Sequence, residues 1–200
     1  HTVSLPKQPL AQLLQPWLTS STHIKVLCDA RADADTLHHL YGIRLAGVVD
    51  VQLCHALAVG ESLGATGSPD RAGGAFFPAG LSKLTSTYCS AELSAPIAQL
   101  KSHFGAIFDS GRSPFRELPL SPAAVAYAAS DVWNTFLVYE ALWPVLQSKG
   151  LAARTLAASE SAARKPKRHD SPTTEPPCSK ASGSTVSAII VSIAPPHTPS

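Results

Sequence analysis

The chain of 200 residues contains no methionine, and it begins with His1. Because translation starts at methionine, we expect a processed chain or a fragment. The longest apolar run, Val186–Ala194, is far shorter than the ~20 residues that cross a bilayer. No charged segment followed by an apolar run opens the sequence, so no signal peptide is visible. These absences predict an intracellular protein without membrane contact, and they leave nucleus and cytoplasm as open alternatives.

Cysteine is scarce as well, and the net charge is small. The four cysteines, at positions 28, 54, 89 and 178, form no C-x-x-C pair. Such wide spacing does not fit a zinc site and predicts reduced thiols, most of them in the core. Residues 1–150 carry 10 Lys and Arg against 11 Asp and Glu, a net charge of −1. This balance excludes nucleic-acid binding through an overall basic surface, although a local basic groove remains possible.

Apolar patterning predicts one α/β domain over residues 1–157. The loop Gly60–Gly80 is rich in glycine and long for a compact domain. From about Ala158 the composition turns to Ser, Thr, Pro, Lys and Arg, which predicts a disordered tail over 158–200. Its basic cluster, 164–168, is either a nuclear or nucleic-acid signal or a solvated tail. Short apolar runs predict strands at Thr22–Cys28 and Val48–Val51, and helical spacing predicts helices at Leu10–Leu18, Ala34–Tyr41, Gln52–Val59, Leu81–Tyr88 and Ala95–Phe108.

The stretch Ser121–Leu146 has the start signals of a long helix. Ser121 is a good capping residue and Pro122 fits the first helical position. Tyr127 and Asp131 are four residues apart, so their side chains leave the same face of that helix. A phenol and a carboxylate in this arrangement could hold a metal ion and a water. They could equally form the solvated face of an ordinary helix.

A second polar cluster follows the first predicted strand. Asp29, Asp33 and Asp35 come directly after Cys28, where a strand gives way to a helix. Carboxylates near a helix N-terminus are favoured by the helix dipole, which is a purely structural explanation. Ligands of α/β folds also bind just beyond the carboxyl ends of strands. The cluster alone does not decide between the two.

Together the two stretches resemble the ribonuclease D-like 3′–5′ exonucleases, over roughly Leu10–Leu146. The second motif of that family is a "KV" strand, a short segment ending in Asp, a helix, a glycine and "FDTQ". Its third motif is "RPL…YAA-x-DV". The matching residues here are Lys25-Val26, Asp29, Arg31, Asp33, Gly42 and Val49-Asp50-Val51-Gln52, then Leu118-Pro119-Leu120 and Tyr127 to Asp131-Val132.

This resemblance implies a ribonuclease H-like α/β fold and Mg²⁺- or Mn²⁺-dependent hydrolysis at the 3′ ends of RNA or DNA. Asp33 and Asp131 occupy the positions of two metal-binding acids, and Tyr127 that of the tyrosine that orients the attacking water. Two hard cations that polarise a phosphate need several carboxylate oxygens. Weaker substrate contacts are implied for Asp29, Arg31 and Lys101.

The sequence also departs from the family. The first motif, D-x-E on an opening strand, has no counterpart, because residues 1–24 contain no Asp or Glu. Cys28 replaces a histidine, Phe115 a tryptophan and Glu117 an arginine. We therefore expect an exonuclease domain lacking its first strands, which as given binds metal weakly and cleaves little or nothing. The alternative is a degenerate exonuclease-like fold that serves as an RNA-binding or adaptor module.

The remaining polar residues have structural explanations. Asp50 and Gln52 stand at the start of a predicted helix and are expected to cap it. Four histidines of the predicted domain are expected at the surface or in the core rather than as ligands; they are His38, His39, His55 and His103. Protein partners are not predicted by any motif.

Overall fold

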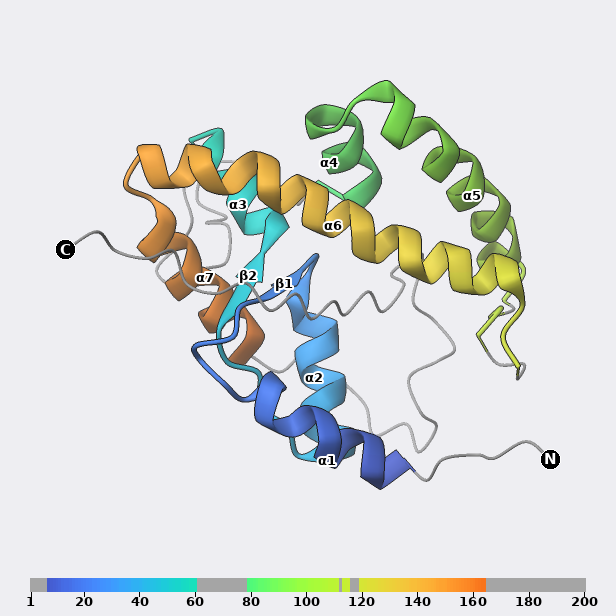
Figure 1. The fold of residues 1–200 in the computed structure, drawn as a ribbon, viewed down its shortest axis with the longest axis horizontal. Helices are drawn as coiled ribbons and strands as arrows, with labels where there is room; N and C mark the ends of the chain where they lie inside the picture. The colour runs from blue at the N-terminus through green and yellow to red at the C-terminus, as the bar shows by residue number, and fades with distance from the viewer. Residues whose placement is uncertain (1–6, 61–78, 112, 116–118, 165–200) are drawn as a thin grey trace.

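The computed structural model describes residues 7–60, 79–111, 113–115 and 119–164 (Figure 1). Helices dominate, as the apolar spacing predicts, and the described sheet is a parallel pair of short strands. The fold is therefore α/β. The elements are α1 (Lys7–Leu18), β1 (Lys25–Leu27), α2 (Ala30–Tyr41), β2 (Val48–Asp50), α3 (Val51–Ala58), α4 (Leu81–Tyr88), α5 (Ala91–Asp109), α6 (Pro122–Ser148) and α7 (Ala152–Arg164).

The two strands divide the core into two layers. β1 and β2 pair in parallel with Val26 opposite Val49, and α2 makes the crossover between them. Successive strand residues point to opposite faces of a sheet. Val26 and Val49 therefore pack on one face with apolar side chains of α3, α4 and α6, whereas Leu27 and Val48 pack on the other with those of α1 and α2. Figure 1 shows the long α6 crossing the first face, beside α3 and α4.

The loop before β1 is fixed by Lys25, whose side chain is buried. Its ammonium donates hydrogen bonds to the carbonyl oxygens of Trp17 (3.2 Å), His23 (2.7 Å) and Ser20. Burial lowers the pKa of Lys25 to about 8. Gly47, just before β2, lies against the backbone of the loop before β1. Its φ is +63°, and a Cβ there would lie 2.7 Å from the carbonyl oxygen of His23. Only glycine fits this close approach without strain.

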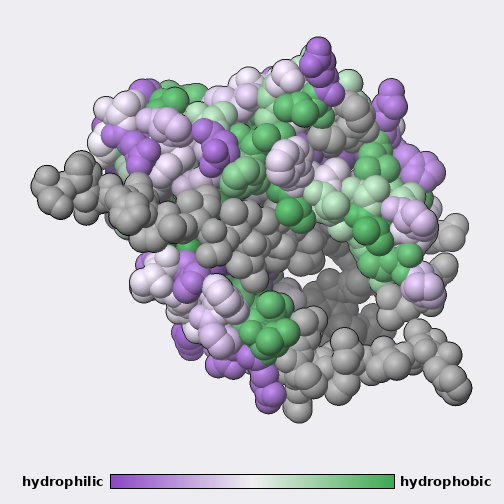
Figure 2. Space-filling model, viewed as in Figure 1, coloured by the Kyte–Doolittle hydropathy of each residue, from purple (hydrophilic) through white to green (hydrophobic). Residues whose placement is uncertain are grey.

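The helix start predicted at Ser121 is confirmed. The Ser121 hydroxyl oxygen accepts a hydrogen bond from the Ala124 N–H at 3.1 Å, and Pro122 is the first helical residue. The helix continues through Pro144 to Ser148. Its outer surface carries exposed Val125, Val132 and Trp133, and Figure 2 shows apolar side chains gathered over this part of the molecule. No helix in the described ranges combines the length and hydropathy needed to span a membrane.

The chain end differs from the sequence prediction. The boundary predicted at 157–158 falls inside α7, which continues to Arg164 and buries Ala158, Ser159 and Ala162. These are small residues, and small side chains let a helix lie close to a sheet. The Ser159 hydroxyl accepts a hydrogen bond from the Asp50 N–H at 3.0 Å. The predicted loop residues 61–78 and tail residues 165–200 lie outside the described residues.

Candidate functional site

The first part of the site is the junction between β1 and α2. Helix α2 begins at Ala30, four residues earlier than the apolar spacing predicts, so Asp33 lies in its first turn. Asp29 precedes the helix with φ +60°, the only positive φ outside glycine among the described residues. Such a left-handed conformation is uncommon outside glycine, and strained backbone of this kind concentrates at functional sites.

The side chain of Asp50 stabilises this junction through hydrogen bonds. Its side chain is buried and accepts hydrogen bonds from the N–H groups of Asp29 (3.2 Å), Ala30 (2.9 Å) and Gln52 (2.9 Å). The capping role predicted for Asp50 is thus confirmed. Gln52 does not cap: its side-chain amide donates to the carbonyl oxygen of Ala79 at 3.1 Å. Asp50 consequently ties the start of α2 to the start of α3.

Asp33 is buried next to this frame. Its side chain is 4% exposed, and its Oδ1 has no hydrogen-bond partner among the described residues. Burial raises the pKa of Asp33 to about 7, and the nearby carboxylates of Asp29 and Asp50 add to the rise. A buried carboxylate without a partner is costly, so such a group favours either protonation or a bound cation.

Asp29 and Arg31 face each other. The Arg31 guanidinium donates to both oxygens of Asp29, from Nε at 2.6 Å and from Nη2 at 3.0 Å. This bidentate hydrogen bond raises the pKa of Arg31. Both residues are therefore engaged with each other at the rim of the site. Their role in substrate contact remains a prediction.

The second part of the site comes from α6. Tyr127 and Asp131 are both buried, so the solvated-face interpretation of this pair is wrong. The Tyr127 ring lies 4.7 Å from that of Phe104, centroid to centroid, and also contacts the rings of Phe108 and Phe115. Asp131 Oδ1 lies 3.0 Å from the Lys101 ammonium of α5. Aromatic packing and an ion pair thus fix this face of α6.

Cys28 lies between the two parts. Burial raises the pKa of its thiol, and the carboxylates of Asp50, Asp29 and Asp131 raise it further, whereas the Lys101 ammonium opposes them. β1 contacts α6, and α2 follows β1 directly in the chain, so the end of β1 is close to both the α2 junction and α6. β1 therefore adjoins both parts of the site, although Asp131 is not among the charges that shift the pKa of Asp33.

The carboxylates present do not complete a metal site. The described residues contain no group of three or more His, Cys, Asp or Glu side chains that could hold an ion. Two-metal sites need more carboxylate oxygens than Asp33 and Asp131 supply. The chain thus offers two candidate acids and no finished ion site among its described residues.

Two features of the site were missed by the sequence reasoning. The Lys101–Asp131 ion pair joins two helices, and no local pattern in the sequence predicts it. Asn134, one turn beyond Asp131, is fully buried, and neither polar atom of its side chain has a hydrogen-bond partner among the described residues. A single amide within an apolar helical run was the available signal for Asn134.

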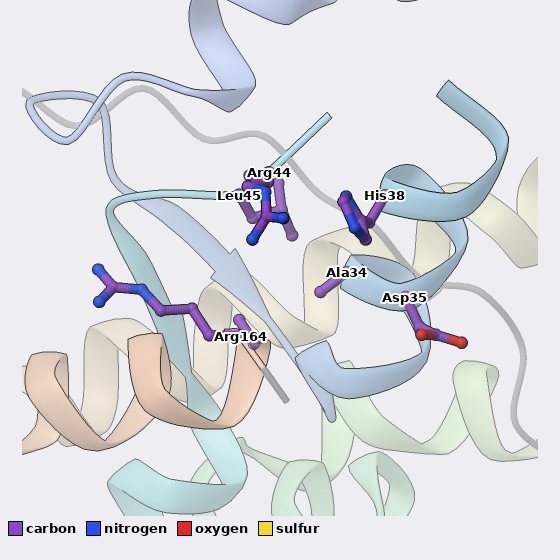
Figure 3. A pocket seen from close by; sticks show the side chains of 7 residues that line it. Ala34, Asp35, His38, Arg44, Leu45 and Arg164 are labelled. Atoms are coloured by element: carbon purple, nitrogen blue, oxygen red, sulfur yellow. The ribbon is translucent and has the colours of Figure 1, made fainter. Parts of the chain in front are cut away.

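A pocket of about 120 Å³ lies elsewhere, between α2, the segment before β2 and the end of α7. Figure 3 shows His38 and Arg44 facing each other across it, while Asp35 points away. Neither of the candidate acids, Asp33 and Asp131, lines the pocket. The pocket between α2 and α7 is therefore separate from the site described above.

Two other histidines have partners of their own. Asp35 lies 3.2 Å from His39, and His55 is hydrogen-bonded to the Tyr88 hydroxyl at 2.7 Å.

Comparison with known proteins agrees with the motifs. A family model described as 3′–5′ exonuclease matches residues 1–147, which is most of the chain. No curated protein and no solved structure matches the chain. The matched region includes both parts of the site, from β1 to nearly the end of α6. The chain belongs to the 3′–5′ exonuclease family.

Proposed function

We propose that this domain belongs to an enzyme that removes nucleotides from the 3′ ends of RNA or DNA with Mg²⁺ or Mn²⁺. In this proposal Asp33 and Asp131 supply two of the carboxylates that hold the ions, and the Tyr127 hydroxyl positions the attacking water. The observation that carries it is the burial of both motif acids, Asp33 of α2 and Asp131 of α6. Bound ions in such sites polarise the phosphate and stabilise the attacking and leaving oxygens.

In this proposal the present chain supplies only part of the metal site. Two carboxylates without the family's D-x-E pair are too few for tight metal binding, so we expect weak metal uptake and little or no cleavage. Asp29, Arg31 and Lys101 are proposed as secondary contacts to the nucleic acid. The surroundings of Tyr127 support its role, because a ring packed against Phe104 and Phe108 presents its hydroxyl in a fixed direction.

A second candidate function is metal-independent binding of nucleic acid by a non-catalytic domain. The Lys101–Asp131 ion pair favours it, because an acid neutralised by a lysine has less need of a metal ion. In this alternative the fold recognises RNA and serves as an adaptor. The two functions differ in whether the bound strand is shortened.

A 3′-labelled single-stranded RNA or DNA distinguishes the two. We expect the chain as given to bind the oligonucleotide without shortening it in Mn²⁺. A longer protein that contains this chain and carries a D-x-E segment ahead of Lys25 is expected to release nucleoside monophosphates. In that protein, Asp131→Asn is expected to reduce the rate by at least about 100-fold, since a metal-held carboxylate is lost.

The control is Glu140→Gln, an exposed carboxylate on the same helix. An unchanged rate in the Asp131→Asn protein would remove Asp131 from the site. Binding without shortening by a longer protein that has the D-x-E pair would favour the adaptor function instead.

A further inference from the structure

The ion pair between α5 and α6 is unusual among the described ion pairs for its burial. The side chains of Lys101 and Asp131 are 18% and 4% exposed. In each of the other pairs the basic side chain is at least 45% exposed: Arg31 with Asp29, His39 with Asp35 and Arg164 with Glu160. Pairs exposed to that degree contribute little to stability, whereas a buried charge depends strongly on its partner.

The position of Lys101 is set by the packing of its own helix. Phe104 follows Lys101 by three residues, so both side chains leave the same face of α5. Phe104 is 2% exposed, and its ring packs against Tyr127 of α6. The contact that holds α5 against α6 therefore also delivers the Lys101 ammonium to Asp131, one turn beyond Tyr127.

An ammonium and a divalent ion compete for the same carboxylate oxygen. The Lys101 Nζ lies 3.0 Å from Asp131 Oδ1 and is a compact point charge on a tethered stem. Its single charge neutralises one carboxylate, whereas Mg²⁺ or Mn²⁺ carries two charges and holds several carboxylate oxygens in its coordination shell. A metal ion that takes this oxygen must first displace a cation that is already in place.

The two candidate acids therefore differ. Asp131 has a lysine as its counter-charge, whereas Asp33 is in none of the ion pairs of the described residues. In a site built only for metal ions, both acids would be left for the ions. Instead, the acid on the α6 side of this site is neutralised by the chain itself.

We propose that Lys101 is a resident counter-cation for Asp131, which keeps this acid buried without a metal and opposes the uptake of divalent ions. The proposal rests on the proposed function in so far as Asp131 is a metal ligand there. It replaces the direct contact of Lys101 with substrate by a role inside the site. Lys101 is thus a positioning residue, and it acts through Asp131.

Calorimetric titration of Mn²⁺ into the metal-free chain tests this, without any nucleic acid. Lys101→Met is expected to bind Mn²⁺ at least tenfold more tightly than the unchanged chain. The double variant Lys101→Met with Asp131→Asn is expected to lose this gain. The matched control is Lys83→Met, which removes an exposed lysine of α4 and should leave the affinity unchanged. Equal affinity of Lys101→Met and the unchanged chain, or a gain that survives in the double variant, would overturn the proposal.

Lys101→Met also leaves Asp131 without its lysine, so each variant is checked first by thermal unfolding. Should Lys101→Met not fold, the side-chain ¹⁵N signals of the lysines in the unchanged chain and in Asp131→Asn give an independent answer. The Lys101 Nζ signal is expected to shift, and its protons to exchange faster with water, when Asp131 loses its charge. An Nζ signal that is the same in both proteins would contradict the ion pair.

The outcomes separate this proposal from the proposed function. Tighter Mn²⁺ binding by Lys101→Met supports the counter-cation whether or not any longer protein cleaves nucleic acid. Conversely, metal-dependent cleavage that needs Asp131, together with unchanged Mn²⁺ affinity in Lys101→Met, supports the enzyme and rejects the counter-cation.

Discussion

Asp50→Ala is expected to lower the free energy of unfolding by about 3–5 kcal/mol, because it leaves buried backbone donors without an acceptor. Three N–H groups, from Asp29, Ala30 and Gln52, lose their acceptor together. Two of them open α2 and the third lies in the first turn of α3, so both helix starts are weakened. Burial raises the pKa of Asp50, while the same three N–H donors lower it. The carboxylate therefore depends on these donors as much as they depend on it.

Urea unfolding monitored by circular dichroism at neutral pH measures this effect. Asp50→Asn keeps one oxygen acceptor and should fall between the unchanged chain and Asp50→Ala. The control is Asp109→Ala, the same change at an exposed position at the end of α5. A loss below about 1 kcal/mol for Asp50→Ala, the size expected of a single ordinary hydrogen bond, would show that Asp50 does not hold the junction.

Asp33→Asn is expected to stabilise the metal-free domain at pH 8 and to have little effect near pH 4. The pKa of Asp33 is raised to about 7 in the folded chain from an ordinary value of 3.8. The folded state thus binds more protons than the unfolded state between these values, and its stability falls as the pH rises through this window. One pKa unit corresponds to about 1.4 kcal/mol, so the loss by pH 8 is at most about 4 kcal/mol.

The measurement is urea unfolding in EDTA at several pH values between 4 and 8, with Asp109→Asn as the exposed control. The difference between Asp33→Asn and the unchanged chain should grow steadily with pH and level off above about 7. A difference that is constant across this range would mean that Asp33 is not held as a buried, repelled carboxylate.

The local parts of this fold could be predicted from the sequence. The Ser-Pro start of α6 and the apolar runs of β1 and β2 depend on neighbouring residues alone. Helix α4 likewise has the predicted bounds, Leu81–Tyr88. The start of α2 lies earlier than predicted because the N–H groups of Asp29 and Ala30 donate to Asp50, which lies on another element. No helix is predicted at α7 from the sequence, because its alanines and serines resemble linker composition, and only contact with β2 and α3 reveals their burial.

For the site, too, the sequence predicts what depends on local motifs and misses what depends on long-range packing. The motifs selected Asp33, Tyr127 and Asp131 as residues of interest, and the structure shows all three to be buried. Their metal and water roles remain predictions. The motifs did not predict that Lys101 neutralises Asp131, since this depends on how α5 packs against α6. Long-range pairing of this kind has no periodicity in the sequence from which it could be inferred.

The central claim is that Asp33 and Asp131 are the acids of this domain that face a metal ion. The most direct test is the broadening of backbone amide signals in the NMR spectrum of the unchanged chain as Mn²⁺ is added. The account predicts that signals around Asp33 and Asp131 broaden first, and that Asp33→Asn with Asp131→Asn abolishes this effect. Broadening confined to exposed acids such as Glu92 and Glu140, with both regions unaffected, would contradict it.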